Sequence, residues 1–369
     1  MNTPTTPSPG TAETATGETA TAETATGETA AMDRRVTVTA DGEVTLDRVP
    51  RPRPAAGEVR VSTRLIGICG TDVHARRGEH PFISRPYHPG HEAVGVVAET
   101  GPGVTSLAEG DRVLLEPNLV CGTCRHCRSG RYNICATLRV IGCQTAGAMA
   151  DSFTVPAGRL HRVPDGLTDA QAVLVEPLAT PVHAVRRAGD LAGSDVLVIG
   201  AGPIGLLTAL ATRAAGARTV IVTDPVAAKR DRALRLGADA AYAPDTPGLP
   251  DVVRERLGGG ADAVFDCVSV SASVTQAVQI VEKGGTVMVV GVPQGPSSVP
   301  LDLVQDREIT VRGSLMYVEE DVRAAVSLLA AGAVPVEEFI TATFPLDRAD
   351  EAFRAAGSPD QMKVLVAVG

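Results

Sequence analysis

The feature that most restricts the fold of this chain is a glycine-rich hexapeptide, GAGPIG, at residues 200–205. It follows the apolar run 196–199 and opens a helical pattern over 203–215, so a strand, a tight turn and a helix follow one another. In the spacing Gly-x-Gly-x-x-Gly, the first glycine permits the turn, the second lets a ligand approach the backbone, and the third lets helix and strand pack closely. The stretch is typical of a dinucleotide-binding β-α-β unit.

The residues after the hexapeptide sharpen this hypothesis. A pyrophosphate would lie on the unpaired N–H groups at the positive end of the helix dipole. A second apolar run, 219–223, ends in Asp224, which is placed to accept a hydrogen bond from the ribose 2′-hydroxyl of NAD and to repel a 2′-phosphate. An ordinary strand-turn-helix without a ligand is the alternative. The predicted contacts with the dinucleotide here are Gly200, Gly202, Pro203, Ile204, Gly205 and Asp224.

Short apolar runs and helical patterns alternate around this motif. The expected strands are 196–199, 220–223, 240–242, 263–267, 286–290 and 309–311. Helical patterns lie between them, for example over 227–236 and 273–281. This alternation predicts an α/β domain with a doubly wound parallel sheet of six strands, which binds its ligand at the carboxyl ends of the strands.

The N-terminal half shows a different pattern. From about residue 36, short β-like runs at 58–68, 93–99 and 111–115 are separated by glycines, which predicts a compact, mostly β domain. Six of the seven cysteines lie in this half, between residues 69 and 143. Their spacing indicates two separate metal sites.

The first predicted metal site is a cluster of four cysteines with the spacing C-x2-C-x2-C-x7-C. Four thiolates this close can converge on one tetrahedral zinc ion, which leaves no open coordination position, so the zinc would be structural. Disulfides are the less favoured alternative because the chain shows no secretory signal. An iron–sulfur cluster is a further alternative, since such clusters use related spacings. The predicted ligands are Cys121, Cys124, Cys127 and Cys135.

The second predicted metal site has looser spacing. The stretch GICGTDVH contains Cys69, Thr71 and His74, the stretch GHE contains His91 and Glu92, and the stretch VEPLA contains Glu176. A thiolate, an imidazole and a carboxylate would give three protein ligands and leave a position for water or substrate. This set is typical of a catalytic metal.

Taken together, these motifs resemble the zinc-containing medium-chain alcohol and polyol dehydrogenases from about Arg35 to the C-terminus. The resemblance implies a mostly β, GroES-like catalytic domain with a Rossmann domain inserted into it, one catalytic and one structural Zn²⁺, and NAD-linked oxidation of an alcohol or reduction of a ketone. By this resemblance, Glu176 occupies the third ligand position, where alcohol dehydrogenase has cysteine. A glutamate there is a feature of the sorbitol, xylitol and butanediol dehydrogenase branch. Whether Glu92 or Glu176 binds zinc directly stays open.

The resemblance also implies roles for further residues. Thr71 would relay the substrate proton through the nicotinamide ribose to His74, and Glu92 would belong to the catalytic group beside the zinc. Lys229 would reach the adenosine ribose, and Val290 and Val292 would lie against the nicotinamide. Lys229 and its neighbour Arg230 could together accept a 2′-phosphate, so NADP remains the alternative to NAD.

The expected domain organisation follows from the same patterns. Residues 1–31 contain the decapeptide TAETATGETA twice, at 11–20 and 21–30, and this tract without apolar periodicity is expected to be a disordered tail. Residues 32–180 would form the catalytic domain with its structural zinc lobe, 181–315 the Rossmann domain, and 316–369 the return to the catalytic domain.

The composition of the chain reduces the number of function classes to consider. The chain has no run of 18 apolar residues that could span a membrane, and its net charge of −9 is unpromising for nucleic acid. We expect a cytoplasmic homodimer or homotetramer that acts on a small-molecule secondary alcohol, such as a polyol, cyclitol or sugar alcohol, or on the matching ketone. An amino-alcohol or threonine-type dehydrogenase is one alternative. A dinucleotide-binding protein without dehydrogenase activity is another, which the complete set of zinc and relay residues disfavours.

Overall fold

The computed structural model describes residues 31–369, so the tail expected at 1–31 lies, apart from Ala31, outside the described residues. Residues Met32–Gly369 form one compact unit. Within the described part of the chain, no helix is long and apolar enough to cross a membrane.

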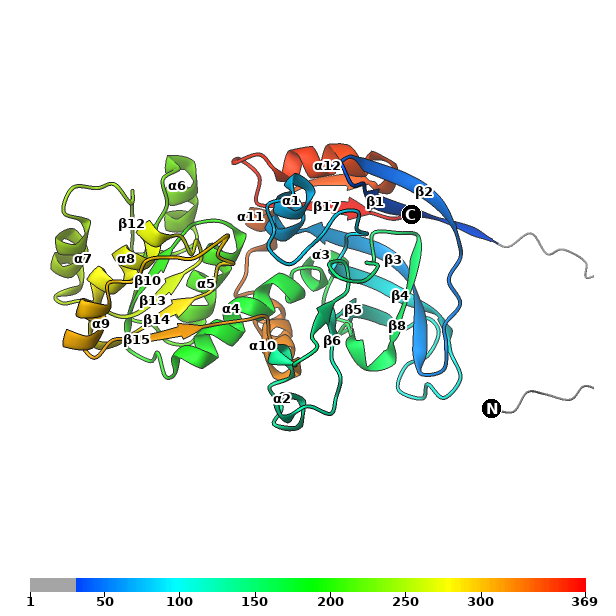
Figure 1. The fold of residues 1–369 in the computed structure, drawn as a ribbon, viewed down its shortest axis with the longest axis horizontal. Coiled ribbons are helices and arrows are strands. Elements are labelled where there is room, and N and C mark those ends of the chain that lie inside the picture. The colour runs from blue at the N-terminus through cyan, green and yellow to red at the C-terminus, as the bar shows by residue number, and fades with distance from the viewer. Residues whose placement is uncertain (1–30) are drawn as a thin grey trace, which may run out of the picture. The chain divides into compact units, whose positions relative to one another are not determined.

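The first sheet has seven strands, five from the N-terminal half and two from the C-terminal end, in the order β16-β17-β3-β4-β5-β9, with β8 also paired to β3 (Figure 1). Alternate residues of β3 are buried, which places one face of the strand on a core shared with the other strands. A separate antiparallel hairpin, β1 with β2, precedes this sheet. The strands are β1 (Met32–Val38), β2 (Val44–Pro50), β3 (Glu58–Ile68), β4 (Glu92–Thr100), β5 (Arg112–Leu115), β8 (Ser152–Pro156), β9 (Leu160–Arg162), β16 (Ile340–Pro345) and β17 (Lys363–Ala367).

The second half contains the expected sheet of six parallel strands, in the order β12-β11-β10-β13-β14-β15. This order, which reverses direction next to the first strand, is that of a doubly wound Rossmann fold. The strands are β10 (Asp195–Ile199), β11 (Thr219–Thr223), β12 (Ala240–Tyr242), β13 (Ala261–Asp266), β14 (Val281–Val289) and β15 (Thr310–Gly313). The prediction of the fold class is confirmed.

The central strand β10 of this sheet is buried on both sides, because helices cover both faces of the sheet. Val196 and Val198 pack into one core with the helices α4 (Val175–Ala188) and α5, whereas Leu197 and Ile199 pack into another with α7 and α8. The helices of this half are α5 (Pro203–Ala214), α6 (Ala227–Arg235), α7 (Leu249–Leu257), α8 (Ser271–Ile280) and α9 (Leu301–Asp306).

Two packed helices, α4 (Val175–Ala188) and α10 (Glu319–Ala330), lead into and out of the Rossmann sheet. After α10 the chain continues through α11 (Val336–Phe339), β16 and α12 (Ala349–Ala356) to β17, and so rejoins the first sheet beside β3. The Rossmann domain is therefore an insertion. The boundary expected between residues 180 and 181 falls inside α4.

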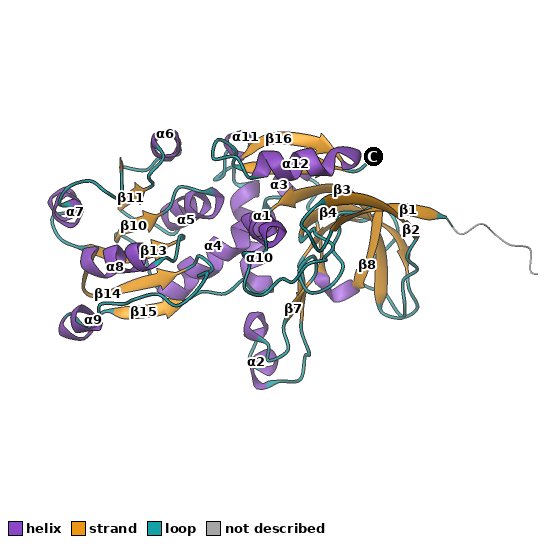
Figure 2. Cartoon of the chain, turned by 45° about the horizontal axis from the view of Figure 1, so that its top comes forward, coloured by secondary structure: helices purple, strands orange, loops and turns teal. Residues whose placement is uncertain are grey.

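Short elements complete the catalytic half. The pair β6 (Asn118–Leu119) and β7 (Arg139–Val140) forms the base of the segment that carries the four clustered cysteines, and Figure 2 shows this segment extending away from the sheets. The remaining elements are α1 (Gly70–Arg77), α2 (Arg125–Arg128), α3 (Asp169–Ala172) and the 3-10 turns η1 (Tyr132–Ile134), η2 (Ala157–Arg159) and η3 (Leu346–Arg348).

One strand differs clearly from its predicted range. β14 begins at Val281, five residues before the expected run 286–290. A register shift in its pairing with β13, between Ala261 and Ala263, accommodates the stretch Glu282–Gly285 within the strand. Its polar residues and two glycines interrupt the apolar pattern, so sequence periodicity could not detect that part.

Candidate active site

The glycine loop lies at the carboxyl end of β10, and each glycine has a different reason for being there. Gly200 has a φ of +96°, and a Cβ on Gly205 would lie 1.8 Å from the carbonyl oxygen of Gly200. Gly202 is the N-cap of α5, and a Cβ there would meet no protein atom within 4 Å. The space at Gly202 is thus not needed for packing. It fits a ligand phosphate at the N-terminus of α5, where Pro203 and Ile204 form the first turn.

Asp224 follows β11 and is 7% exposed. Its Oδ2 accepts a hydrogen bond from the backbone N–H of Ala201 at 2.8 Å, and its Oδ1 accepts one from the N–H of Val226 at 2.8 Å. The carboxylate is therefore fixed beside the glycine loop. Arg230 donates to the carbonyl oxygens of Asp224 and Pro225, at 2.8 and 2.9 Å.

Other predicted cofactor residues lie on neighbouring elements. Lys229 is half-buried in the first turns of α6, the helix that follows Asp224. Val290 and Val292 directly follow β14, the former 7% and the latter 46% exposed. Since parallel strands end at one edge of the sheet, these positions share the edge of the glycine loop.

The structure brings together three of the predicted catalytic metal ligands. The ligand atoms of Cys69, His91 and Glu92 all lie within 4.8 Å of one another. Cys69 is the N-cap of α1 directly after β3, whereas His91 and Glu92 stand at the start of β4, the partner of β3. One soft thiolate, one imidazole and one carboxylate form a donor set that suits zinc, so these residues fit the metal.

The carboxylate of Glu92 has a second partner. Lys363, at the start of β17, donates from Nζ to both carboxylate oxygens of Glu92, and both side chains are almost completely buried. Burial is the largest single effect and lowers the pKa of Lys363, but the charge and hydrogen bond of Glu92, together with the charges of Cys69 and Glu176, make the net shift upward. Gly67 provides room for this group, because a Cβ there would lie 1.9 Å from Oε2 of Glu92.

Asp72, which sequence reasoning missed, supports two of these ligands. Its Oδ2 accepts a hydrogen bond from the N–H of Cys69 at 3.0 Å and lies 3.8 Å from Nδ1 of His91. This Nδ1 has no hydrogen-bond partner among the described residues. A carboxylate behind a metal-binding histidine orients the imidazole ring. The available signal was the position of Asp72 as the third residue of α1, where it closes a capping box with Cys69.

Glu176 lies in the first turn of α4 and is not one of the three residues whose ligand atoms lie within 4.8 Å of one another. Its Oε1 accepts a hydrogen bond of 2.6 Å from the hydroxyl of Tyr317, which is completely buried. Burial raises the pKa of Glu176 to about 7, and the negative charge of Glu92 adds to this effect. Tyr317 is a second residue that sequence reasoning did not assign to the site.

Thr71 and His74 lie on α1, one and four residues inside its N-terminus. Thr71 is half-buried, and the side chain of His74 is 45% exposed. The Nδ1 of His74 lies 3.1 Å from Oε2 of Glu79 and 3.4 Å from Nε2 of Gln294, which belongs to the loop after β14. His74 thus stands where the catalytic half meets the Rossmann half.

The four clustered cysteines also fit zinc. The sulfur atoms of Cys121 and Cys127 are 3.9 Å apart, and those of Cys124 and Cys127 and of Cys121 and Cys135 are 3.5 Å apart. A tetrahedral site with Zn–S bonds of about 2.3 Å has edges of about 3.8 Å. Backbone N–H groups of Thr123 and Cys124 lower the pKa of Cys121 to about 5, which favours the thiolate that a metal needs.

The remaining two cysteines, Cys143 and Cys267, are half-buried and belong to neither metal cluster. Burial raises the pKa of Cys267 to about 12, so its thiol stays protonated. Cys267 packs against the apolar core of the Rossmann half.

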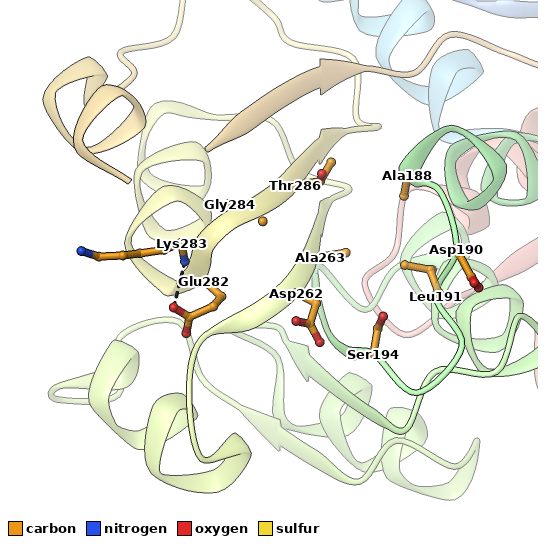
Figure 3. Close-up of a pocket in the computed structure, with 11 residues that line it drawn as sticks. Ala188, Asp190, Leu191, Ser194, Asp262, Ala263, Glu282, Lys283, Gly284 and Thr286 are labelled. Atoms are coloured by element: carbon orange, nitrogen blue, oxygen red, sulfur yellow. Dashed lines mark hydrogen bonds between the residues drawn. The ribbon is translucent and has the colours of Figure 1, made fainter. Parts of the chain in front are cut away.

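A pocket of about 280 Å³ lies at the opposite edge of the Rossmann sheet, near the starts of β13 and β14 (Figure 3). Its acidic groups are occupied within the protein. Asp262 accepts a hydrogen bond from the N–H of Asp195, and Glu282 accepts from those of Gly260 and Lys283. Because doubly wound sheets bind ligands at their carboxyl ends, we do not assign this pocket to the active site.

Comparison with known proteins agrees with this geometry. The family described as "Alcohol dehydrogenase GroES-like domain" matches residues 55–165, and the family described as "Zinc-binding dehydrogenase" matches residues 203–331. Sorbitol dehydrogenase of Bos taurus is 34% identical over 341 residues, which are 90% of this chain and 95% of the bovine protein.

Solved structures give the same result. A protein from Sinorhizobium meliloti 1021, described as a zinc-binding dehydrogenase and solved with NADP, superimposes with a TM-score of 0.84 at 34% identity, over 91% of this chain and 99% of that one. An alcohol dehydrogenase from Escherichia coli CFT073, solved with NADH, gives a TM-score of 0.86 at 27% identity, over 91% and 99% of the two chains.

The fold and the two metal-binding clusters define a zinc-dependent dehydrogenase with a nicotinamide cofactor. The chain belongs to the zinc-containing medium-chain alcohol and polyol dehydrogenase family. The predictions of the family, of the enzyme class and of zinc and a nicotinamide dinucleotide as cofactors are thereby confirmed.

Proposed function

We propose that this enzyme oxidises a secondary alcohol of the polyol, cyclitol or sugar-alcohol class with NAD. The observation that carries the proposal is the convergence of Cys69, His91 and Glu92 in a chain 34% identical to a sorbitol dehydrogenase. When bound, zinc would polarise the substrate oxygen as a Lewis acid and NAD would accept the hydride.

We assign Cys69, His91 and Glu92 as the direct ligands of the catalytic zinc, and Cys121, Cys124, Cys127 and Cys135 as those of the structural zinc. Glu176 is not among the residues whose ligand atoms group within 4.8 Å, which supports an outer role for it. Held by Tyr317, the Glu176 carboxylate would face the open coordination position and orient a water molecule or the substrate hydroxyl there.

Thr71 and His74 would move the substrate proton to solvent. Thr71 lies two residues after Cys69, so its hydroxyl can be held beside the substrate oxygen. The exposure of His74 suits exchange with solvent, and Glu79 accepts a hydrogen bond when the proton is on Nδ1. Nε2 then carries the lone pair and could accept the proton that the substrate releases.

Asp224 supports NAD rather than NADP. Its fixed carboxylate can accept from a ribose 2′-hydroxyl and would repel a 2′-phosphate. Arg230 is held by two carbonyl oxygens of the same loop, so accepting a 2′-phosphate would require it to leave them. The glycine loop would bind the pyrophosphate, with Lys229 at the adenosine ribose and Val290 and Val292 at the nicotinamide.

An amino-alcohol or threonine-type dehydrogenase is the second candidate, since the zinc chemistry would be the same.

We also propose that the chain is divided into domains at residues 32–180, 181–315 and 316–369. A homodimer or homotetramer is supported by β15, an exposed edge strand with Val311 39% exposed. A cytoplasmic location is supported by the four-thiol cluster, which needs a reducing compartment.

The test is NADH formation by the zinc-loaded protein with polyols, cyclitols, diols and amino alcohols, repeated with NADP and after a strong zinc chelator. Turnover of polyols or cyclitols that the chelator abolishes supports the proposal. Turnover confined to amino alcohols supports the second candidate. If folded, zinc-loaded protein oxidises none of these classes, the proposed substrate class is wrong.

A further inference from the structure

The structural zinc lobe, defined here as residues 121–135, contacts the segment 315–319 that carries Tyr317. This segment links the last strand of the Rossmann sheet to α10, far from the lobe in the sequence. Asn133 of the lobe is 4% exposed and donates from Nδ2 to the carbonyl oxygen of Leu315 at 2.8 Å. The hydroxyl of Tyr132 accepts a hydrogen bond from the N–H of Glu319. The lobe therefore holds the backbone two residues before and two residues after Tyr317.

A third contact holds Tyr317 itself. Asn118, in the strand pair at the base of the lobe, is completely buried and donates from Nδ2 to the carbonyl oxygen of Tyr317 at 3.1 Å. With its backbone fixed at three alternate positions, Tyr317 presents its hydroxyl to Glu176 at 2.6 Å. Met316, between the held positions, has a φ of +46°. Such backbone strain in a non-glycine residue persists only where the surrounding contacts enforce it.

The same lobe residue also reaches the helix that carries Glu176. Asn133 lies 3.2 Å from Nε2 of His183, whose Nδ1 pairs with the buried Asp321 at 2.8 Å. His183 follows Glu176 by seven residues on α4, and positions seven apart lie on the same face of a helix. Asn133 thus contacts both the segment that carries Tyr317 and the helix that carries Glu176.

The turn that carries these two lobe residues is joined to the thiol cluster through Cys135. Tyr132 and Asn133 form the turn η1, which ends at Cys135, and the N–H of Cys135 donates to the carbonyl oxygen of Tyr132 at 2.9 Å. The ring of Tyr132 also lies under the guanidinium of Arg159, at 5.1 Å, and Arg159 pairs with the buried Glu116. Tyr132 is thus held by Arg159 and by the backbone bond to Cys135, one of the four clustered cysteines.

From these contacts we propose that Tyr132 and Asn133 are positioning residues for the active site, through which the structural zinc lobe holds Tyr317 and Glu176 in place for catalysis. The lobe then serves the reaction as well as stability. The inference rests on the proposed function, because it assigns Glu176 to the open coordination position of the catalytic zinc. Residues that orient the groups around a metal ligand typically change metal affinity or activity about 10- to 100-fold when they are removed.

The test compares Asn133→Ala, Tyr132→Phe and Tyr317→Phe in the full chain with zinc in the lobe and Co²⁺ in the catalytic site. The visible absorption of Co²⁺ reports the geometry of the catalytic site without turnover, and its loss to a chelator reports affinity. We expect Tyr317→Phe to lower Co²⁺ affinity about tenfold or more. Asn133→Ala and Tyr132→Phe should change the spectrum in the same direction with a smaller loss of affinity.

The double variant Asn133→Ala/Tyr317→Phe separates positioning from general stability. If Asn133 acts through Tyr317, adding Asn133→Ala to Tyr317→Phe should change the Co²⁺ spectrum and affinity little further, whereas independent effects would add. Ser129→Ala is the matched control, because Ser129 is an exposed lobe residue that bonds only within the lobe, to the carbonyl oxygen of His126. Tyr132→Phe loses a single hydroxyl and keeps the inference testable if Asn133→Ala does not fold.

Any of three results would overturn the inference. The Co²⁺ affinity of the catalytic site could be unchanged in Tyr317→Phe, unchanged in both lobe variants, or reduced additively in the double variant. The spectrum is measured without substrate, so a failure to find any alcohol that is oxidised would contradict the proposed function and leave this comparison valid.

Discussion

Lys363 donates hydrogen bonds from Nζ to both carboxylate oxygens of Glu92, at 2.6 and 2.8 Å, and these two residues are 271 positions apart in the chain. The pair joins β17, the last strand, to β4 through the catalytic centre. It neutralises a carboxylate that we assign to the zinc, and it keeps the returning C-terminal segment in the first sheet.

We predict that Lys363→Met destabilises the metal-free protein by about 3 to 5 kcal/mol, because it leaves Glu92 buried without a counter-charge. Urea unfolding measures the change. Lys283→Met, at an exposed position, is the control and should stay within about 0.5 kcal/mol of the wild type. The double variant Glu92→Gln/Lys363→Met should recover part of the loss. A loss below about 1 kcal/mol in Lys363→Met would show that the buried pair contributes little.

The second prediction concerns the choice of cofactor. Asp224→Asn keeps an acceptor for the N–H of Ala201 or Val226 but removes the charge that would repel a 2′-phosphate. We expect the ratio of kcat/KM for NAD to that for NADP to fall about tenfold or more, which corresponds to about 1.4 kcal/mol. Asp245→Asn, on an exposed loop, is the matched control. An unchanged ratio would mean that another group excludes NADP.

Features that depend on neighbouring residues could be predicted from the sequence. The glycine loop, Asp224 and the four-cysteine cluster each lie within a short stretch whose spacing fixes its geometry. The alternation of apolar runs gave the order of strands and helices in the Rossmann domain. Cys69, His91, Glu92 and Glu176 could be grouped by residue type alone, and the structure brings the first three together where β3 and β4 pair.

Contacts between distant parts of the chain could not be predicted in this way. Lys363 and Glu92, or Tyr317 and Glu176, which are 141 residues apart, show no periodicity or spacing that links them. Their meeting depends on the insertion of one domain into another and on the return of β17 to β3. The separation of Glu176 from the other three residues likewise depends on the position of α4, which no local pattern specifies.

The third prediction follows from the raised pKa of Glu176. In the metal-free folded protein burial keeps this carboxyl protonated up to about pH 7, whereas in the unfolded chain it ionises near its ordinary pKa of 4.5. The folded state then binds more protons between these values, so the contribution of Glu176 to stability falls as pH rises through this window, by about 3 kcal/mol in total.

Unfolding of the metal-free protein at pH 4.5 and at pH 7.5 measures this dependence. Glu176→Gln keeps an acceptor for Tyr317 but cannot ionise, so the decrease should be smaller in this variant than in the wild type. Glu109→Gln, at an exposed position, is the control. Equal slopes in the wild type and Glu176→Gln would contradict the assignment.

The last prediction concerns the proton relay. Glu79 is placed beside His74 by the end of α1, where Gly78 adopts a φ of +76° and the N–H of Glu79 donates to the carbonyl oxygen of His74 at 2.9 Å. The carboxylate of Glu79 favours the tautomer with its proton on Nδ1, whereas the amide of Gln294 at 3.4 Å would donate to the same nitrogen and favour the other.

We expect Glu79→Ala to shift His74 toward the second tautomer and to slow alcohol oxidation about two- to fivefold, since an exposed pair contributes at most about 1 kcal/mol. Glu79→Gln, which keeps an oxygen acceptor, should lose less. Nitrogen-15 chemical shifts of the His74 ring measure the tautomers directly, and added imidazole should restore part of the rate because it offers another proton acceptor. A slowed Glu79→Ala variant with an unchanged tautomer, or one that imidazole cannot restore, would place the effect of Glu79 outside the relay.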